Sequence, residues 1–140
     1  GFIEKCREIS KSEKIDIIII DYLQLLAIDS EAVNETLVRL KQLALELDCP
    51  VLVMSQLNRS VEKREGHMPE ISDLPQCKSI DEIADGILLL YRDAYYDKKA
   101  DKNSATIVIA KHKRCGRKCT HICYDADIPM FRVGDSFGQI

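Results

Sequence analysis

A single carboxylate ends the most apolar stretch of this sequence. Residues 17–20 are four consecutive isoleucines, and Asp21 follows them directly. Four aliphatic residues followed by an aspartate form the Walker B pattern, in which a carboxylate at a strand end holds the Mg²⁺ of a bound nucleotide through water. An aspartate that only caps the turn after a strand has the same spacing. The pattern therefore leaves two interpretations open, a magnesium site at Asp21 and an ordinary strand end.

A second candidate is Gln56, which ends the stretch PVLVMSQ at residues 50–56. In open α/β sheets, ligands bind beyond the carboxyl ends of the parallel strands. If this stretch and the one before Asp21 are neighbouring strands, Asp21 and Gln56 emerge at the same edge. A glutamine there can orient an attacking water or sense a γ-phosphate, although a solvated loop residue fits the spacing equally well.

A run of cations follows the last long apolar stretch. It comprises Lys111, Lys113, Arg114, Arg117 and Lys118. Cations just past a strand suit a phosphate, or the nucleotide of a neighbouring subunit, but such a run is also typical of a solvated surface. A zinc site is a further alternative, since His112, Cys115, Cys119, His121 and Cys123 lie in the same region. Their spacing has no C-x-x-C pair and no second cluster to close a tetrahedron, so thiols in a hairpin fit better.

The elements that must position these residues follow from apolar spacing. Residues 2–9 predict a short amphipathic helix, and residues 15–21 predict a strand buried on both faces because their apolar residues are nearly continuous. A helix from Ser30, its N-cap, to Leu47 follows, and Pro50 begins the next strand. Strand, helix and strand with short connections predict a parallel βαβ unit.

The second half of the chain predicts mainly strands. We expect a loop at residues 57–77 and one or two helical turns capped by Ser79. The remaining elements are strands at residues 86–92 and 105–113, a charged turn between them, and a closing hairpin at residues 118–124 and 130–133. The predicted fold class is α/β, a mainly parallel sheet flanked by helices with a C-terminal hairpin.

Composition narrows the class of protein. The chain has 140 residues, of which 46% are apolar, enough for one domain with a core. A net charge of −3 gives no general basic excess to indicate nucleic-acid binding. Six cysteines in a chain of this size predict reduced thiols, and no apolar run is long enough for a membrane span. We therefore expect a cytoplasmic protein, and its first residue, a glycine, indicates a piece of a longer chain.

Five segments in series resemble a known family. They are IIIIDYLQL (17–25), LKQLALELDCPVLVMSQLNRSVEKR (40–64), SDLPQCKSIDEIAD (72–85), ILLLYRD (87–93) and IVIAKHKRCG (107–116). In this order and at this spacing they resemble the C-terminal motor domain of the DnaB-type replicative DNA helicases, a branch of the RecA-like ATPases. The resemblance implies that residues 1–140 are the C-terminal portion of a single RecA-like P-loop NTPase domain, whose N-terminal portion is absent here.

The resemblance also implies an activity. Members of this family form ATP-driven hexameric rings that move 5′ to 3′ on single-stranded DNA and unwind the duplex ahead. Primase and a helicase loader are the further partners that the resemblance suggests. ATP and Mg²⁺ are the implied cofactors, and the bacterial or phage-infected cytoplasm, near the nucleoid, is the implied location.

Site roles follow from the same resemblance. Asp21 would be the Walker B aspartate that holds Mg²⁺ through water, and Gln56 would sense the γ-phosphate. Lys111 and a nearby cation would reach the triphosphate of the neighbouring subunit. In the family this segment reads lysine, any residue, arginine, asparagine, glycine, whereas this chain has one residue more between Lys111 and Gly116. Aligning the pattern on Gly116 selects Arg114 as that cation, and aligning it on Lys111 selects Lys113. The planar, bidentate guanidinium favours Arg114.

Two further features depart from the family pattern. Where the family has arginine, glutamate, serine and glycine to grip the DNA backbone, this chain has Pro75, Gln76, Cys77 and Lys78. Gln76 and Lys78 remain candidates for DNA contact, whereas Pro75 removes a cation and a backbone donor. None of the six glycines begins a G-x-x-x-x-G-K-[ST] phosphate loop. We therefore expect no ATP hydrolysis by this chain alone, and a non-catalytic module that binds the ring or its loader remains an alternative.

Overall fold

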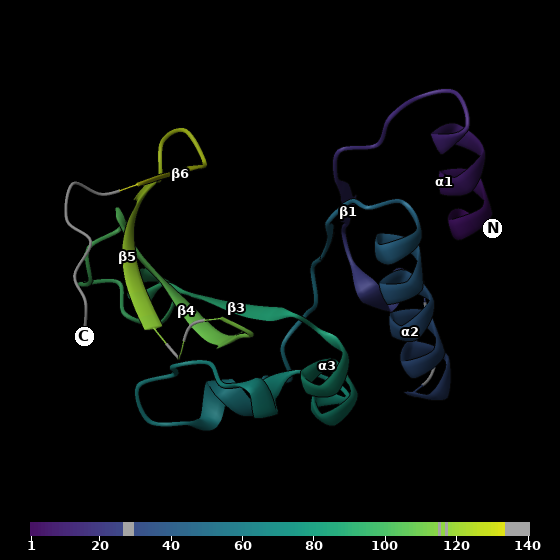
Figure 1. Cartoon of the computed structure of the whole chain (residues 1–140). Coiled ribbons are helices and arrows are strands. Elements are labelled where there is room, and N and C mark those ends of the chain that lie inside the picture. The colour runs from purple at the N-terminus through teal and green to yellow at the C-terminus, as the bar shows by residue number, and fades with distance from the viewer. Residues whose placement is uncertain (27–29, 115, 117, 134–140) are drawn as a thin grey trace. The chain divides into compact units, whose positions relative to one another are not determined.

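The computed structural model describes residues 1–26, 30–114, 116 and 118–133. The chain divides into two compact units, which are described one at a time (Figure 1). Unit 1 comprises Gly1–Asn58 and Leu74–Ala84, and unit 2 comprises Arg59–Asp73 and the described residues from Asp85 on. The backbone therefore passes from unit 1 to unit 2 and back before it enters the second sheet.

Unit 1 is built around two parallel strands. Its elements are α1 (Phe2–Ser10), β1 (Ile18–Ile20), the 3₁₀ turn η1 (Leu23–Leu25), α2 (Ser30–Glu46), β2 (Val51–Val53) and α3 (Cys77–Ile83). β1 and β2 pair in parallel, with Ile18 opposite Val51 and Ile20 opposite Val53. The predicted βαβ unit is confirmed, with α2 as its crossover.

The core of unit 1 lies where α1, α2 and one face of the two strands meet. Its buried members are Ile3, Cys6, Ile18, Ile20, Leu40, Leu43 and Cys49. Leu43, on α2, is completely buried. The side chain of the predicted N-cap, Ser30, lies outside what the structure describes.

The other face of the β1–β2 pair is not buried. Ile17 and Ile19 are 50% and 57% exposed, and Leu52 and Met54 on the same face are also exposed. The prediction of a strand buried on both faces is therefore wrong for this structure. A continuous aliphatic run does not say what covers each face, and no element among the described residues covers this one.

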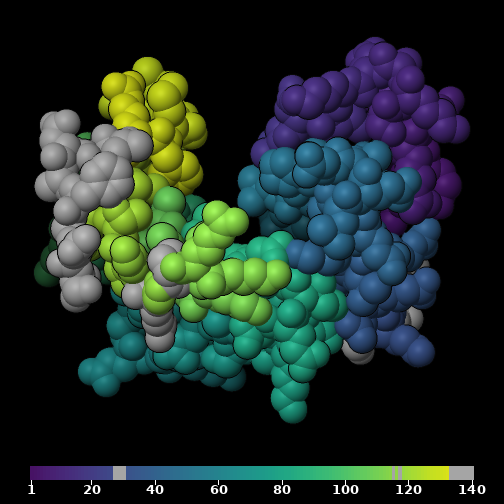
Figure 2. Space-filling model, viewed as in Figure 1, coloured from purple at the N-terminus to yellow at the C-terminus, as the bar shows by residue number. Residues whose placement is uncertain are grey.

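Unit 2 is an antiparallel sheet with a folded connection beside it. Its elements are η2 (Arg59–Lys63), η3 (Ile71–Asp73), β3 (Gly86–Tyr91), the single turn α4 (Asp93–Tyr96), β4 (Ser104–His112), β5 (Lys118–Asp125) and β6 (Met130–Val133). The strand order is β3-β4-β5-β6, and each neighbouring pair is antiparallel. The C-terminal hairpin is confirmed, and its β6 end is drawn in yellow in Figure 2.

The expected mainly parallel sheet is only partly matched. Among the described residues only β1 and β2 pair in parallel, and the four strands of unit 2 form a separate antiparallel sheet. Short connections allow consecutive strands to pair antiparallel, whereas each parallel pair needs a crossover. The α/β class holds, but most of the strand pairing is antiparallel.

Two expected helix and loop boundaries also differ. α3 begins at Cys77, and its N-cap is Gln76 with φ 49° and ψ 42° rather than Ser79. The expected loop at residues 57–77 contains the two 3₁₀ turns η2 and η3. None of the helices in the described ranges is long and apolar enough to cross a membrane.

Candidate functional site

The carboxyl ends of β1 and β2 form one edge of unit 1. Because the two strands are parallel and Ile20 lies opposite Val53, they end side by side. Two backbone hydrogen bonds extend the pairing beyond the strands. The N–H of Met54 donates to the carbonyl of Ile20 at 2.9 Å, and the N–H of Leu23 donates to the carbonyl of Met54 at 2.8 Å. Asp21, directly after β1, and Gln56, three residues after β2, therefore follow strands that end at the same edge.

Gln24 connects the two chain segments at this edge. Its side-chain amide donates to the hydroxyl of Ser55 at 3.1 Å, and its carbonyl oxygen accepts from the backbone N–H of Gln56 at 3.5 Å. The turn η1 carries Gln24 to this position. Sequence reasoning assigned Gln24 no role, and its only signal was its place three residues after Asp21.

Asp21 and Gln56 both expose their side chains at this edge. Within the described residues the Asp21 carboxylate has no hydrogen-bond or ion-pair partner, and it is not hydrogen-bonded to Gln56. A buried carboxylate needs a partner because its desolvation is costly, but Asp21 remains in water and has no such need. An accessible, unpaired carboxylate fits the water-mediated ligand that Mg²⁺ prefers.

The candidate cations of unit 2 lie where β4 ends. Lys111 and His112 are the last two residues of β4, opposite Ile87 and Gly86. Lys113 is held twice by Asp85, because its ammonium pairs with the Asp85 carboxylate and its backbone N–H donates to the Asp85 carbonyl at 3.2 Å.

Arg114 is held differently from Lys113. Its backbone N–H donates to Nδ1 of His112 at 3.1 Å, and its side chain is exposed. In the described part of the chain its guanidinium forms no ion pair. Arg117 and Cys115, which the sequence placed in the same cluster, lie outside the described residues, and Lys118 begins β5.

The candidates for DNA contact lie at the start of α3. Gln76 is half-buried in a left-handed backbone conformation, and Lys78 is exposed in the first turn. Gln76 caps the helix without a side-chain hydrogen bond. Within the described residues of unit 1, neither side chain is hydrogen-bonded to Asp21 or Gln56.

The thiols and imidazoles considered for zinc are arranged along β4 and β5. His121 lies opposite Thr106, and its Nδ1 is 3.2 Å from the threonine hydroxyl. Among the described residues, no group of three or more histidine, cysteine, aspartate or glutamate side chains could hold a metal ion. This finding does not cover Cys115.

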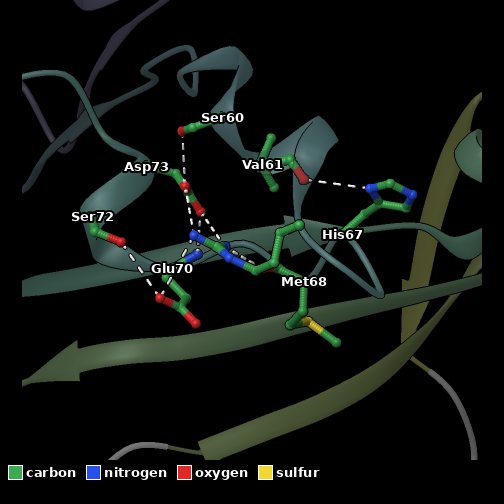
Figure 3. A network of polar contacts seen from close by, with 8 residues as sticks. Ser60, Val61, His67, Met68, Glu70, Ser72 and Asp73 are labelled. Carbon is green, nitrogen blue, oxygen red and sulfur yellow. Dashed lines mark hydrogen bonds and ion pairs between the residues drawn. The ribbon is translucent and has the colours of Figure 1, made fainter.

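A polar network around the buried Asp73 in unit 2 was not foreseen from the sequence (Figure 3). Asp73 is 1% exposed and accepts two hydrogen bonds from the guanidinium of Arg64, at 2.7 and 2.9 Å. The Ser60 hydroxyl and the Glu70 backbone N–H also donate to Asp73, and Arg64 donates to the Met68 carbonyl. These bonds hold residues 59–73 in a defined fold.

Burial and hydrogen bonding shift the pKa values of two residues of unit 2, Asp73 and Tyr91. The hydrogen bonds from Arg64 lower the pKa of Asp73 below its ordinary value, against the opposing effect of burial. The Tyr91 hydroxyl lies within hydrogen-bond distance of the Gly66 carbonyl and the Asp93 carboxylate. Burial, followed by the contact with Asp93, raises the pKa of Tyr91 to about 12. Tyr91 therefore remains a neutral phenol at physiological pH.

The family of this chain follows from a comparison with known protein families. Residues 2–133 match the model of the DnaB-like helicase C terminal domain. This chain belongs to that family. The predicted resemblance is therefore confirmed.

Similar replicative DNA helicases agree with the family match. The replicative DNA helicase DnaB of Geobacillus stearothermophilus is 41% identical over 117 residues, which are 78% of this chain and 26% of the relative. DnaB of Leifsonia xyli is 36% identical over 134 residues, 91% of this chain and 29% of the relative. The chain thus spans between a quarter and a third of the length of these relatives.

Two solved structures have the same fold. One of them, an ATPase domain, superposes with a TM-score of 0.85 and 35% identity, and the match covers 96% of this chain and 50% of that one. A DnaB-like replicative helicase, whose structure was described with its interactions with primase, gives a TM-score of 0.83 and 36% identity, with 94% and 33% covered. The RecA-like fold that the sequence resemblance implied is thus supported by DnaB-like ATPase structures.

Proposed function

We propose that this chain is the C-terminal portion of a single RecA-like ATPase domain in a replicative DNA helicase. The observation that carries the proposal is the shared edge of β1 and β2, from which Asp21 and Gln56 emerge with exposed side chains. This is the edge at which open α/β sheets bind ligands. The family match supports the proposed reaction class, ATP hydrolysis coupled to DNA unwinding.

Asp21 would hold Mg²⁺ through water, and Gln56 would orient the attacking water or sense the γ-phosphate. The ion would neutralise the charge on the ATP phosphates. Gln24 supports this arrangement because it hydrogen-bonds Ser55 and the backbone N–H of Gln56. The phosphate loop would come from a part of the protein outside these residues.

Lys111 and Arg114 would act on the nucleotide of the neighbouring subunit. In a hexameric ring, a cation supplied across the interface stabilises the charge that develops on the transferred phosphoryl group. The exposure of Arg114 and its lack of an ion pair in the described residues are compatible with this role.

Gln76 and Lys78 would contact the backbone of single-stranded DNA as the ring moves 5′ to 3′. Lys78 is exposed and cationic, which suits a phosphate. Primase and a helicase loader would be the protein partners, and the cytoplasm of a bacterium or phage-infected cell would be the location. The family membership and the bacterial relatives support these assignments.

The test uses the full-length protein that contains this chain. Asp21→Ala and Gln56→Ala should each lower the DNA-stimulated kcat for ATP by at least about 100-fold, because both groups act on the reacting phosphate. Asp16→Ala is the matched control for Asp21, since Asp16 is an exposed carboxylate four residues before β1 ends and pairs only with exposed Lys14 in the described part of the chain. Wild-type activity in the Asp21 and Gln56 variants would contradict the proposed sites.

A non-catalytic module is the second candidate, and the observation that favours it is Pro75 in place of a DNA-gripping arginine. Such a module would bind the ring or its loader without turning over ATP. Full-length protein that assembles into hexamers but hydrolyses no ATP with single-stranded DNA present would favour this candidate. The 140-residue chain alone should show no ATP turnover in either case.

A further inference from the structure

The turn after β4 carries two cations, Lys113 and Arg114, whose side chains differ in their ionic contacts. The Lys113 ammonium is paired with the carboxylate of Asp85, and the Lys113 N–H is bonded to the carbonyl of the same residue. An ammonium next to a carboxylate presents little net charge to a third group. Lys113 is therefore poorly placed to act on a phosphate.

Arg114 is fixed through its backbone and leaves its side chain exposed. Its N–H donates to Nδ1 of His112 at 3.1 Å, and a ring nitrogen accepts such a bond through its lone pair. The bond ties the backbone of Arg114 to the last residue of β4. It leaves the guanidinium available to a ligand.

A β-bulge in β4 precedes the turn. Ile87 lies opposite Lys111 and Leu88 lies opposite Ile109, so Ala110 is an extra residue without a partner in β3. Bulges bend a strand and change the direction of the side chains that follow. The bulge therefore contributes to the direction in which the turn leaves β4.

We propose that Asp85 and His112 are positioning residues that select Arg114, rather than Lys113, as the cation presented to a phosphate oxyanion. Asp85 occupies the competing ammonium, and His112 fixes the backbone from which the guanidinium extends. This inference rests on the proposed function, because the oxyanion would be that of a neighbouring subunit's ATP. It adds two residues to that site, neither of which touches the nucleotide.

The first test compares the two cations in the full-length protein. Arg114→Ala should lower the DNA-stimulated kcat by about 10³-fold with little change in the KM for ATP, because the cation acts on the transition state. Lys113→Ala should cost only about three- to tenfold, because it breaks an exposed ion pair within the turn. A loss in Lys113→Ala equal to that in Arg114→Ala would overturn the selection.

The second test compares two replacements of His112. His112→Asn keeps an acceptor near the position of Nδ1 and should retain activity within about threefold, whereas His112→Leu removes the acceptor and should lower kcat about tenfold. In an Arg114→Ala background, the two His112 variants should be indistinguishable, since the residue acts only through Arg114. Equal losses in Asn and Leu, or a persistent difference without Arg114, would overturn the role of His112.

The third test separates Asp85 from a purely structural role. Asp85→Asn should lower kcat by the same factor as Lys113→Ala, and neither change should lower kcat further in an Arg114→Ala background, because the pair acts only through Arg114. Additive losses would overturn the role of Asp85. Failure of the proposed function has a different result, because Asp21→Ala would then retain wild-type turnover or the wild type would hydrolyse no ATP.

Discussion

The two units use an aspartate in opposite ways. Asp21 in unit 1 is exposed and, within the described residues, has no partner, whereas Asp73 in unit 2 is 1% exposed and accepts hydrogen bonds from three residues. The difference teaches that a carboxylate kept in water is available to a ligand, while a buried one must be satisfied by the protein itself. The first suits a binding site and the second stabilises a connection.

The largest expected effect concerns the strand that carries Asp21. Ile20 is 6% exposed and its neighbour Ile19 is 57% exposed. Ile20→Ala should lower the free energy of unfolding by about 2–5 kcal/mol, because it leaves a cavity in the core. Ile19→Ala should change it by about 0.5 kcal/mol or less. Urea denaturation of the purified chain measures both, and equal losses would mean that the open face of β1 is covered in solution.

The second prediction compares the two aspartates directly. Asp73→Ala should lower the free energy of unfolding by about 2 kcal/mol, because it removes the buried carboxylate that accepts hydrogen bonds from Ser60, Arg64 and the Glu70 N–H. Asp21→Ala should leave this free energy within about 0.5 kcal/mol of wild type.

Glu65→Ala is the control for Asp73, as an exposed carboxylate in the same connection. Hydrogen exchange of residues 59–73 gives a local readout, since Asp73→Ala should accelerate it and Glu65→Ala should not. If Asp21→Ala proved the more destabilising of the two aspartate variants, the proposed division of roles would be wrong.

The smallest expected effect is the pH dependence of unit 2. The pKa of Asp73 is lowered in the folded protein, chiefly by hydrogen bonds from Arg64. Its contribution to stability is therefore fully present above the ordinary aspartate pKa of about 4, and it is lost as the pH falls through the lowered pKa.

The comparison variant for this prediction is Asp73→Asn, which cannot ionise. Between about pH 4 and pH 2, the wild type should lose about 1 kcal/mol more stability than the variant. Chemical denaturation at a series of pH values measures this difference. If the free energy of unfolding fell equally with pH in the two proteins, the hydrogen-bond partners of Asp73 would not stabilise its ionised form.

Much of the local structure could be predicted from the sequence because it follows from short-range chemistry. The period of apolar residues in α1 and α2 is set by the helix itself, and the predicted βαβ unit and C-terminal hairpin are confirmed. The family could also be predicted, because segments such as IIIIDYLQL place a strand, a turn and a candidate magnesium ligand within a few residues. The roles of Asp21, Gln56, Lys111 and Arg114 stay predictions.

Other features could not be read from the sequence. The Arg64–Asp73 pair spans nine residues of a segment with no apolar period, so nothing marked it as a folded connection. The N-cap of α3 is Gln76 and not the better-suited Ser79, because the left-handed backbone at Gln76 begins the helix earlier. Such features depend on which groups lie close together in the folded chain.

The sequence by itself determined which residue types stand at the strand ends and which family the chain resembles, because both depend on order along the chain. Only the tertiary structure decided which of two adjacent isoleucines is buried, which aspartate is paired and which cation of the turn is already occupied. The physical reason is that burial and pairing are properties of neighbours in space. Ile19 and Ile20 are the same residue type, and Lys113 and Arg114 carry the same charge, but the fold places different neighbours beside the members of each pair.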